Sequence, residues 1–170
     1  MAAPANASNA PTETAQSSST EVLDSKWEAE FRATLVNLGY DKPTQDEIIS
    51  DAKIIGASEP APTLGKQSST GGVSTLAAAN ACSYSPESYL FGLVSFTATC
   101  QQHDICYGPN SFTDRYACDQ AFLAELINDC YSVLGTTGTV SNGCVSQAGV
   151  YYGAVRAFGS SSYDGRGANN

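Results

Sequence analysis

The sequence predicts an all-α, disulfide-stapled helical domain, and three features of the chain lead to this prediction. Apolar side chains recur at the spacing of an α-helix in several segments. All six cysteines lie between residues 82 and 144, as in a framework of disulfide bonds. The chain has 170 residues, of which 42% are hydrophobic, so one compact domain with appended segments can form a core. We expect an antiparallel pair of helices, a third C-terminal helix and an additional N-terminal helical pair.

The charge of the chain argues against two kinds of partner. The net charge is −9 at pH 7, and only eight residues are Lys or Arg. Nucleic acids and anionic membranes both attract clusters of basic residues, so we expect neither as a partner. A zwitterionic or purely apolar surface is not excluded. The sequence contains no run of about eighteen apolar residues, so we expect no membrane-spanning segment.

The cysteines also predict the compartment. An even number of cysteines in so short a stretch is typical of proteins from an oxidising environment. The first residues lack the apolar segment of a secretory signal. We therefore expect a secreted monomer whose signal peptide is not present in this sequence.

Composition divides the chain into four regions. Residues 1–20 have almost no large apolar side chain and are predicted to be disordered. Residues 21–56 have helical periodicity, and residues 57–76, rich in Ser, Gly and Pro, are predicted to be a linker. Residues 77–170 form the main domain. The helical pair in 21–56 is either a pro-segment that covers the functional site or extra packing for a small domain.

The two N-terminal helices have local start and stop signals. The first carries a stripe of apolar residues at i, i+4 and i+8, namely Trp27, Phe31 and Leu35, and Gly39 is its expected end. The second follows Pro43, with Thr44 and Glu47 as a capping box and Gly56 as its end.

The main domain begins with a polar loop over residues 80–92, which is followed by two helices. The first helix is expected to end at Tyr107, before a Gly-Pro turn. The second is expected to be capped by Ser111 and Asp114 and to run to about Tyr131.

A third helix is predicted from about Ser141 to the stop at Gly159. Its apolar stripe contains Cys144, Ala148, Tyr151, Val155 and Phe158. The last eleven residues are rich in Gly, Ser and Asn, and we expect them to fray.

The only histidine and one carboxylate fall on the inward faces of the two central helices. The stripe of the first helix contains Phe96, Cys100, His103 and Tyr107, and that of the second contains Asp119, Leu123, Leu126 and Cys130. A charge on such a face needs a partner, because burying it alone costs roughly 2–7 kcal/mol or more. We therefore expect antiparallel helices on which His103 faces Asp119. Such a pair, with Asp104 beside it, is typical of a proton-transfer site.

The segment Cys100-Gln-Gln-His-Asp-Ile-Cys-Tyr-Gly108, followed by Ala117-Cys118-Asp119, resembles the secreted phospholipase A2 family. The family motif is C-x-x-H-D-x-C-Y on one helix and a C-D pair on the next. The short connection between the two helices is similar to that of the compact bacterial and fungal branch. A segment like residues 150–159 also follows the last cysteine in that branch. The resemblance covers roughly residues 80–159 and leaves residues 1–79 outside.

The resemblance implies three disulfide bonds, namely Cys82–Cys100, Cys106–Cys118 and Cys130–Cys144. Spacing agrees for the middle bridge, because Cys106 and Cys118 are equally far from the turn between antiparallel helices. On cysteine counting alone, fifteen pairings are possible. The middle bridge would also fix the helix register that places His103 against Asp119.

The implied chemistry is hydrolysis of the sn-2 ester of a phospholipid at a membrane or micelle surface. His103 would take a proton from the attacking water, and Asp119 would accept the other ring N–H. Tyr107 either donates a hydrogen bond to Asp119 or is an interhelical packing residue.

The resemblance also implies a calcium-binding loop. Asp104 would face the loop over residues 80–92 and bind Ca²⁺ together with Asn80 and the main-chain oxygen of Ala81. The ion would polarise the ester carbonyl. Asn80 departs from the Asp that the bacterial branch has there, so we expect calcium dependence with modest affinity.

Three alternatives stay open at this point. The ligand types of a zinc site occur in Cys100, His103, Cys106 and Cys118. Side chains at the spacing of the first three on a helix converge poorly on one metal, however. His103 could be a satisfied core histidine in a disulfide-rich module. The chain could also be a phospholipase-like binding module or toxin without turnover.

Several apolar residues near the loop are expected either to line an acyl channel or to belong to the core. They are Tyr84, Tyr89, Leu90, Phe91 and Leu93. An enzyme that works at a lipid surface would expose some of them as a patch.

Overall fold

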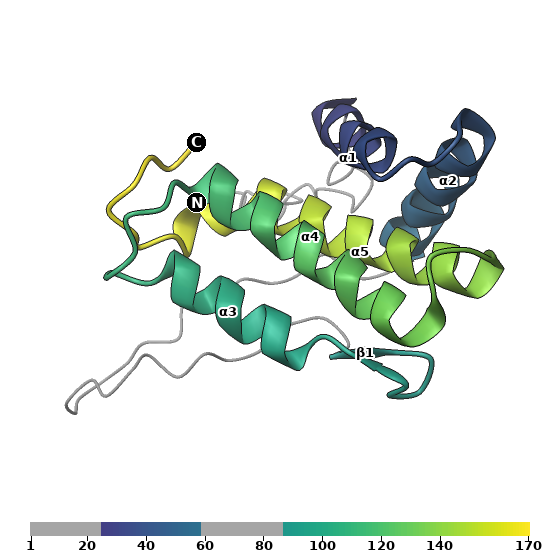
Figure 1. The fold of residues 1–170 in the computed structure, drawn as a ribbon. Coiled ribbons are helices and arrows are strands. Elements are labelled where there is room, and N and C mark those ends of the chain that lie inside the picture. The colour runs from purple at the N-terminus through teal and green to yellow at the C-terminus, as the bar shows by residue number, and fades with distance from the viewer. Residues whose placement is uncertain (1–24, 59–86) are drawn as a thin grey trace, which may run out of the picture.

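A computed structural model describes residues 25–58 and 87–170, and this part of the chain is mostly helical (Figure 1). Its five α-helices are α1 (Ser25–Asn37), α2 (Lys42–Ser58), α3 (Thr97–Tyr107), α4 (Arg115–Leu134) and α5 (Thr139–Phe158). Two short strands, β1 (Ser88–Tyr89) and β2 (Val94–Ser95), precede α3, and a 3₁₀ turn, η2 (Gly159–Ser161), follows α5. The predicted helical, disulfide-stapled fold is confirmed at this level. None of the helices described here is long and apolar enough to cross a bilayer.

Helices α4 and α5 form the centre of the molecule and run antiparallel (Figure 1). Helix α3 lies along α4, also antiparallel, after the short turn that joins them. Helices α1 and α2 lie against α5. Disulfide bonds join α3 to α4 through Cys106–Cys118 and α4 to α5 through Cys130–Cys144, and both pairs have a Cα–Cα distance of 5.8 Å. The predicted bridge Cys82–Cys100 involves a residue outside the described ranges.

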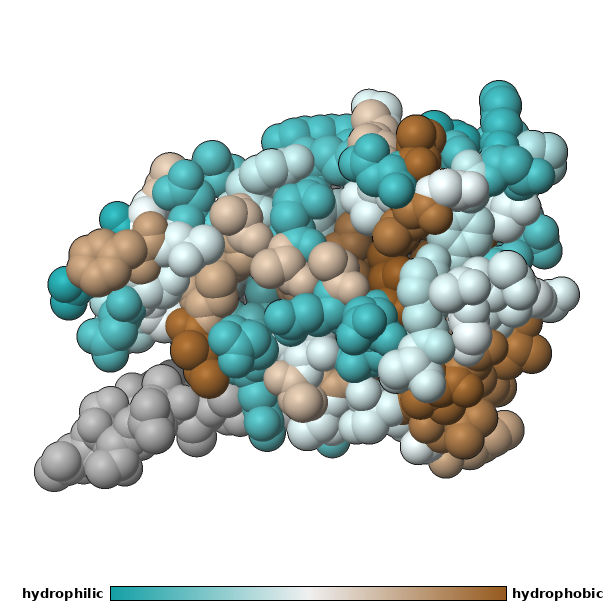
Figure 2. All heavy atoms as spheres, in the orientation of Figure 1, coloured by the Kyte–Doolittle hydropathy of each residue, from teal (hydrophilic) through white to brown (hydrophobic). Residues whose placement is uncertain are grey.

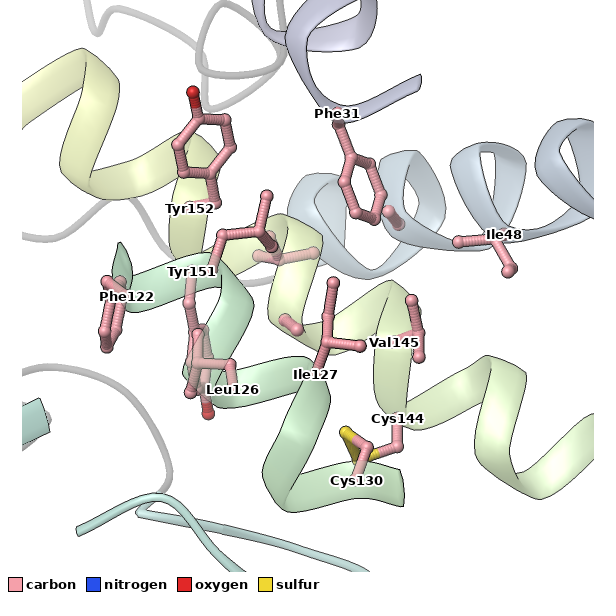
Figure 3. Packing of buried hydrophobic residues seen from close by; sticks show 14 of the residues in the cluster. Phe31, Ile48, Phe122, Leu126, Ile127, Cys130, Cys144, Val145, Tyr151 and Tyr152 are labelled. Atoms are coloured by element: carbon pink, nitrogen blue, oxygen red, sulfur yellow. A yellow bond between two sulfur atoms is a disulfide. The ribbon is translucent and has the colours of Figure 1, made fainter. Parts of the chain in front are cut away.

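The hydrophobic core lies between α4, α5 and the N-terminal helices (Figure 3). The helical pair α1–α2 contributes six buried residues to it, namely Trp27, Phe31, Leu35, Ile48, Ile49 and Ala52. The indole N–H of Trp27 donates to the main-chain oxygen of Gly149 on α5, at 2.9 Å. A Cβ on Gly149 would overlap the Phe31 ring, so a glycine is what lets α1 approach α5 this closely. The helical pair is therefore part of the core.

The cap of α2 differs from the prediction. Asp41, and not Thr44, provides the cap, because its side chain accepts the main-chain N–H of Thr44 at 3.1 Å. Helix α2 also continues past Gly56 to Ser58, so the first two residues of the predicted 57–76 linker are helical. The apolar face of this helix is buried against α5, and that packing outweighs the weak helix propensity of a single glycine. The rest of the linker and the predicted tail over 1–20 lie outside the described residues.

The caps predicted for α4 and the fraying of the C-terminus are both wrong. Asp114 precedes α4, but its Oδ1 accepts the main-chain N–H of Ala168 at 2.6 Å and no N–H of the helix. The hydroxyl of Ser111 accepts the nearby N–H of Thr113 and likewise caps no N–H of the helix. The C-terminal residues return over the α3–α4 turn, where Arg166 N–H donates to the oxygen of Ser111 at 2.7 Å. Residues far away in the sequence therefore supply the hydrogen-bonding partners of the α3–α4 turn and hold the C-terminal residues in place.

The segment before α3 is a small hairpin, where the sequence predicted only a polar loop over 80–92. Strands β1 and β2 pair antiparallel, with Ser88 opposite Ser95 and Tyr89 opposite Val94. The N–H of Phe96 also donates to the oxygen of Glu87 at 2.8 Å. Two-residue strands are too short to give an alternating pattern that the sequence could reveal.

Candidate active site

Helices α3 and α4 are fixed to each other near both ends of α3. The Cys106–Cys118 disulfide joins them next to the turn. Farther along, the Thr99 hydroxyl donates to Asp129 Oδ2 at 2.6 Å. Two constraints about two helical turns apart leave little freedom for one helix to slide or rotate against the other.

Between these two constraints, His103 of α3 faces Asp119 of α4, as the helical periodicity predicts. His103 Nε2 lies 3.0 Å from Asp119 Oδ1, and the Tyr107 hydroxyl donates to the same oxygen at 2.6 Å. Asp119 is fully buried and His103 is only 8% exposed. The imidazole is also packed against two rings, with centroid distances of 4.4 Å to Phe122 and 4.2 Å to Tyr107. Its position and orientation are therefore well defined.

The two nitrogens of His103 have different surroundings. A proton on Nε2 would be donated to Asp119, which leaves Nδ1 unprotonated in the neutral ring. Within the described residues, Nδ1 has no hydrogen-bonding partner. An unprotonated imidazole nitrogen of this kind can accept a proton from a bound water molecule.

Two arginines complete the surroundings of Asp119. Arg156 of α5 donates from Nη1 to Asp119 Oδ2 at 2.9 Å, and Arg115 Nη1 lies 3.6 Å from the same oxygen. The Arg115 Nη1 also donates to the main-chain oxygens of Val155 and Arg156. Asp119 therefore uses Oδ1 for the histidine and tyrosine and Oδ2 for the arginines.

Sequence reasoning missed both arginines. Arg115 could have been found, because it precedes Asp119 by one helical turn on the same helix. Arg156 lies in the segment 150–159, which resembles the family, but spacing along the chain does not show that α5 reaches the site.

These contacts determine the protonation state of the carboxyl. Burial by itself would raise the pKa of Asp119, but the hydrogen bonds from His103, Tyr107 and Arg156 outweigh it and hold the pKa below its usual value. The pKa of Tyr107 is raised, first by burial and then by the adjacent negative charge of Asp119. At neutral pH the site therefore contains a carboxylate and a protonated phenol.

Arg156 links this site to the N-terminal helices. Arg156 Nε lies 3.6 Å from Glu30 Oε2 of α1, and the Tyr152 hydroxyl donates to the same oxygen at 2.6 Å. Burial and the adjacent Glu30 carboxylate both raise the pKa of Tyr152, so its hydroxyl stays protonated and remains a donor. The polar network thus continues from His103 through Asp119 and Arg156 to α1.

No known protein family, curated protein or solved structure matches this chain. The resemblance to secreted phospholipase A2 therefore depends only on the sequence features within residues 80–159. The site must be interpreted from its own geometry.

The predicted calcium ligands are only partly within the described residues. Asp104 is on the exposed side of α3, next in sequence to His103. Asn80 and Ala81 lie outside the described ranges, as does Tyr84. Among the described residues, no group of three or more His, Cys, Asp or Glu side chains could hold a metal ion. The described residues alone therefore do not complete a calcium site.

The zinc alternative is wrong for the set that contains Cys106 and Cys118. These two cysteines are bonded to each other, and a disulfide sulfur is not available as a thiolate ligand. His103 Nε2 also has Asp119 Oδ1 as its hydrogen-bonding partner, at 3.0 Å.

Proposed function

We propose that this protein hydrolyses the sn-2 ester of glycerophospholipids and releases a lysophospholipid and a free fatty acid. The observation that carries the proposal is the buried His103–Asp119 pair, 3.0 Å apart on two disulfide-linked helices. The histidine leaves Nδ1 without a hydrogen-bonding partner in the described residues. This arrangement is suited to a general base, and the motif over 100–119 resembles that of phospholipase A2.

In the proposed reaction, His103 Nδ1 takes a proton from a water molecule as its oxygen attacks the ester carbonyl. Asp119 accepts the Nε2 proton, keeps the ring in the correct tautomer and stabilises the imidazolium that forms. The imidazolium then gives its proton to the leaving glycerol oxygen as the carbon–oxygen bond breaks. The products are a carboxylic acid and the lysophospholipid alcohol, so no atom or charge is left unbalanced.

The remaining contacts of Asp119 support this role by holding the carboxylate in place. Tyr107 donates to the oxygen that also binds His103, and Arg156 fixes the other oxygen. A carboxylate with both oxygens held cannot rotate away from the imidazole. Tyr107 and Arg156 are therefore positioning residues in this proposal.

Calcium remains part of the proposal, with Asp104 as the ligand within the described residues and Asn80 and Ala81 as the further candidates. When bound, the ion would supply positive charge for the oxygen of the ester carbonyl. The two disulfides of the described part are also compatible with the proposed secretion.

The direct test is fatty-acid release from phosphatidylcholine vesicles in the presence of Ca²⁺. We expect His103→Ala to lose activity by at least about a hundredfold, the range of general-base catalysis. Ile54→Ala, at an exposed position on α2, is the matched control and should keep full activity. Excess chelator should abolish hydrolysis by the wild type. Equal rates for wild type and His103→Ala would remove the catalytic proposal, and full hydrolysis in chelator would remove calcium from it.

A second candidate function is a secreted binding module or toxin without turnover. One observation favours it: Arg115 and Arg156 already compensate the charge of Asp119, as a purely structural buried carboxylate would require. If this alternative is correct, wild type and His103→Ala will bind vesicles alike and neither will release fatty acid.

A further inference from the structure

The turn between β1 and β2 exposes three large apolar side chains, which we call the hairpin tip. Phe91 is fully exposed at 109%, Leu93 is 59% exposed and Leu90 is 37% exposed. Figure 2 shows an apolar patch at the lower right, in the region where the β1–β2 hairpin lies in Figure 1. Single exposed apolar residues are common on protein surfaces, whereas three within four positions form a contiguous surface.

The backbone of the hairpin tip is strained at two apolar residues. Leu90 has φ 49° and Phe91 has φ 55°, and Gly92 follows at φ 94°. The left-handed region is unfavourable for bulky L residues, and Asn, Asp or Gly adopts it more readily. Within the described residues, these two are the non-glycine residues with positive φ. Folding alone would favour polar turn residues here, so the leucine and phenylalanine call for another explanation.

The tip is nevertheless held firmly on the fold. The N–H of Leu93 donates to the oxygen of Leu90 at 3.1 Å, which closes the turn. Val94 and Phe96, directly after the tip, are both fully buried. The phenylalanine is therefore projected from a rigid base, and the next element in the chain is α3 with His103.

The charge of this region limits what can bind to it. No charged residue occurs from position 88 to position 102, although the whole chain carries a net charge of −9. A neutral, apolar projection on a chain of net negative charge would not be drawn to an anionic surface. It can enter a neutral interface without bringing a charge out of water.

We propose that the hairpin tip inserts Phe91, with Leu90 and Leu93 beside it, into the interface of zwitterionic phospholipid. The choice of lipid as the occupant rests on the proposed function, and the neutrality of residues 88–102 is the independent physical argument for it. The tip leads directly into the helix that carries His103, so its insertion would bring that helix to the lipid surface. Such docking depends on apolar contact and is insensitive to salt.

The test is co-sedimentation with phosphatidylcholine vesicles, using the full chain in a His103→Ala background so that no substrate is consumed. Phe91→Asn is the informative variant, because asparagine adopts the left-handed conformation and should leave the fold as stable as before or more so. Burial of a phenylalanine in an apolar environment predicts that this variant binds at least about tenfold more weakly. Ile54→Asn, at an exposed position on α2 outside the hairpin tip, should bind as the parent does.

Each result decides the proposal. Weaker binding of Phe91→Asn, with an unchanged control and no effect of added salt, supports it. Absence of parent binding, equal binding by Phe91→Asn, or binding that salt abolishes would overturn it. If Phe91→Asn instead dissociated a dimer in sedimentation equilibrium, the hairpin tip would be a protein–protein interface.

The same variant separates this inference from the proposed function. In the catalytically intact chain, Phe91→Asn should lose hydrolysis of vesicles but keep hydrolysis of a short-chain ester dissolved as monomers. If neither chain hydrolyses any ester and vesicle binding still depends on Phe91, the catalytic proposal fails and the docking surface stands.

Discussion

Replacement of Arg156 by methionine tests whether the polar network around Asp119 holds the site together. Methionine keeps much of the length of the side chain but removes the Nη1 donor, 2.9 Å from Asp119 Oδ2. Hydrogen bonds to charged groups contribute about 1.5–3 kcal/mol, and an uncompensated buried charge costs about 3–5 kcal/mol. Arg115, 3.6 Å from the same oxygen, would still compensate part of the charge. We therefore expect Arg156→Met to lower the free energy of unfolding by about 2–3 kcal/mol.

Urea unfolding followed by circular dichroism measures this loss directly. Lys53→Met is the matched control, because it removes a long basic side chain whose ion pair with Glu28 is largely exposed. Exposed pairs contribute at most about 1 kcal/mol, so the control should remain close to the wild type. Equal stabilities for the two variants would show that Asp119 does not need Arg156. We also expect a lower maximal rate of hydrolysis for Arg156→Met, because the Asp119 carboxylate would be less well positioned.

Three further predictions follow from the same structure. Replacement of Cys106 and Cys118 by alanine opens a loop with a sequence separation of 12, so calorimetry should show a loss of about 3 kcal/mol in the free energy of unfolding. An unchanged stability would contradict the stabilising role of this disulfide. Phe31→Ala should cost about 3–5 kcal/mol in urea unfolding, whereas Phe112→Ala, which is 74% exposed, should cost under about 1 kcal/mol. Because the pKa of Asp119 is lowered in the fold, its contribution is present above the unfolded pKa of about 3.9 and is lost as the pH falls through the folded value. Unfolding at pH values from about 2 to 6 should show this loss in the wild type and not in Asp119→Asn.

The pairing of His103 with Asp119 could be predicted because its causes are local. Both residues lie on the inward stripe of a helix, and a short turn between the helices forces them to run antiparallel. Once Cys106 and Cys118 are joined next to the turn, the register is determined and the two side chains must meet. Helical period and turn length are visible in the sequence, and the equal distance of Cys106 and Cys118 from the turn agrees with the bridge that the resemblance implied.

The remaining contacts of the site depend on packing between distant segments. Arg156 reaches Asp119 because α5 packs against α4, and nothing in the residue spacing shows this packing. The ordered C-terminal residues could not be predicted either, because Gly, Ser and Asn have little side chain to bury. Their main-chain groups are held by partners such as Ser111 and Tyr107, more than fifty positions away in the sequence. Local composition predicts fraying only where no such partners exist.

The network also bears on the role of the N-terminal helical pair. A pro-segment that merely covers a site can be removed without loss of the fold beneath it. Here Phe31 and Ile48 are fully buried against α5, and Glu30 shares Arg156 with the carboxylate that holds His103. Removal of α1 and α2 would expose the apolar face of α5 and leave Arg156 with one acidic side-chain partner fewer. We therefore expect cleavage after α2 to destabilise the site and not to uncover it, which is the result that the packing interpretation of residues 21–56 predicts.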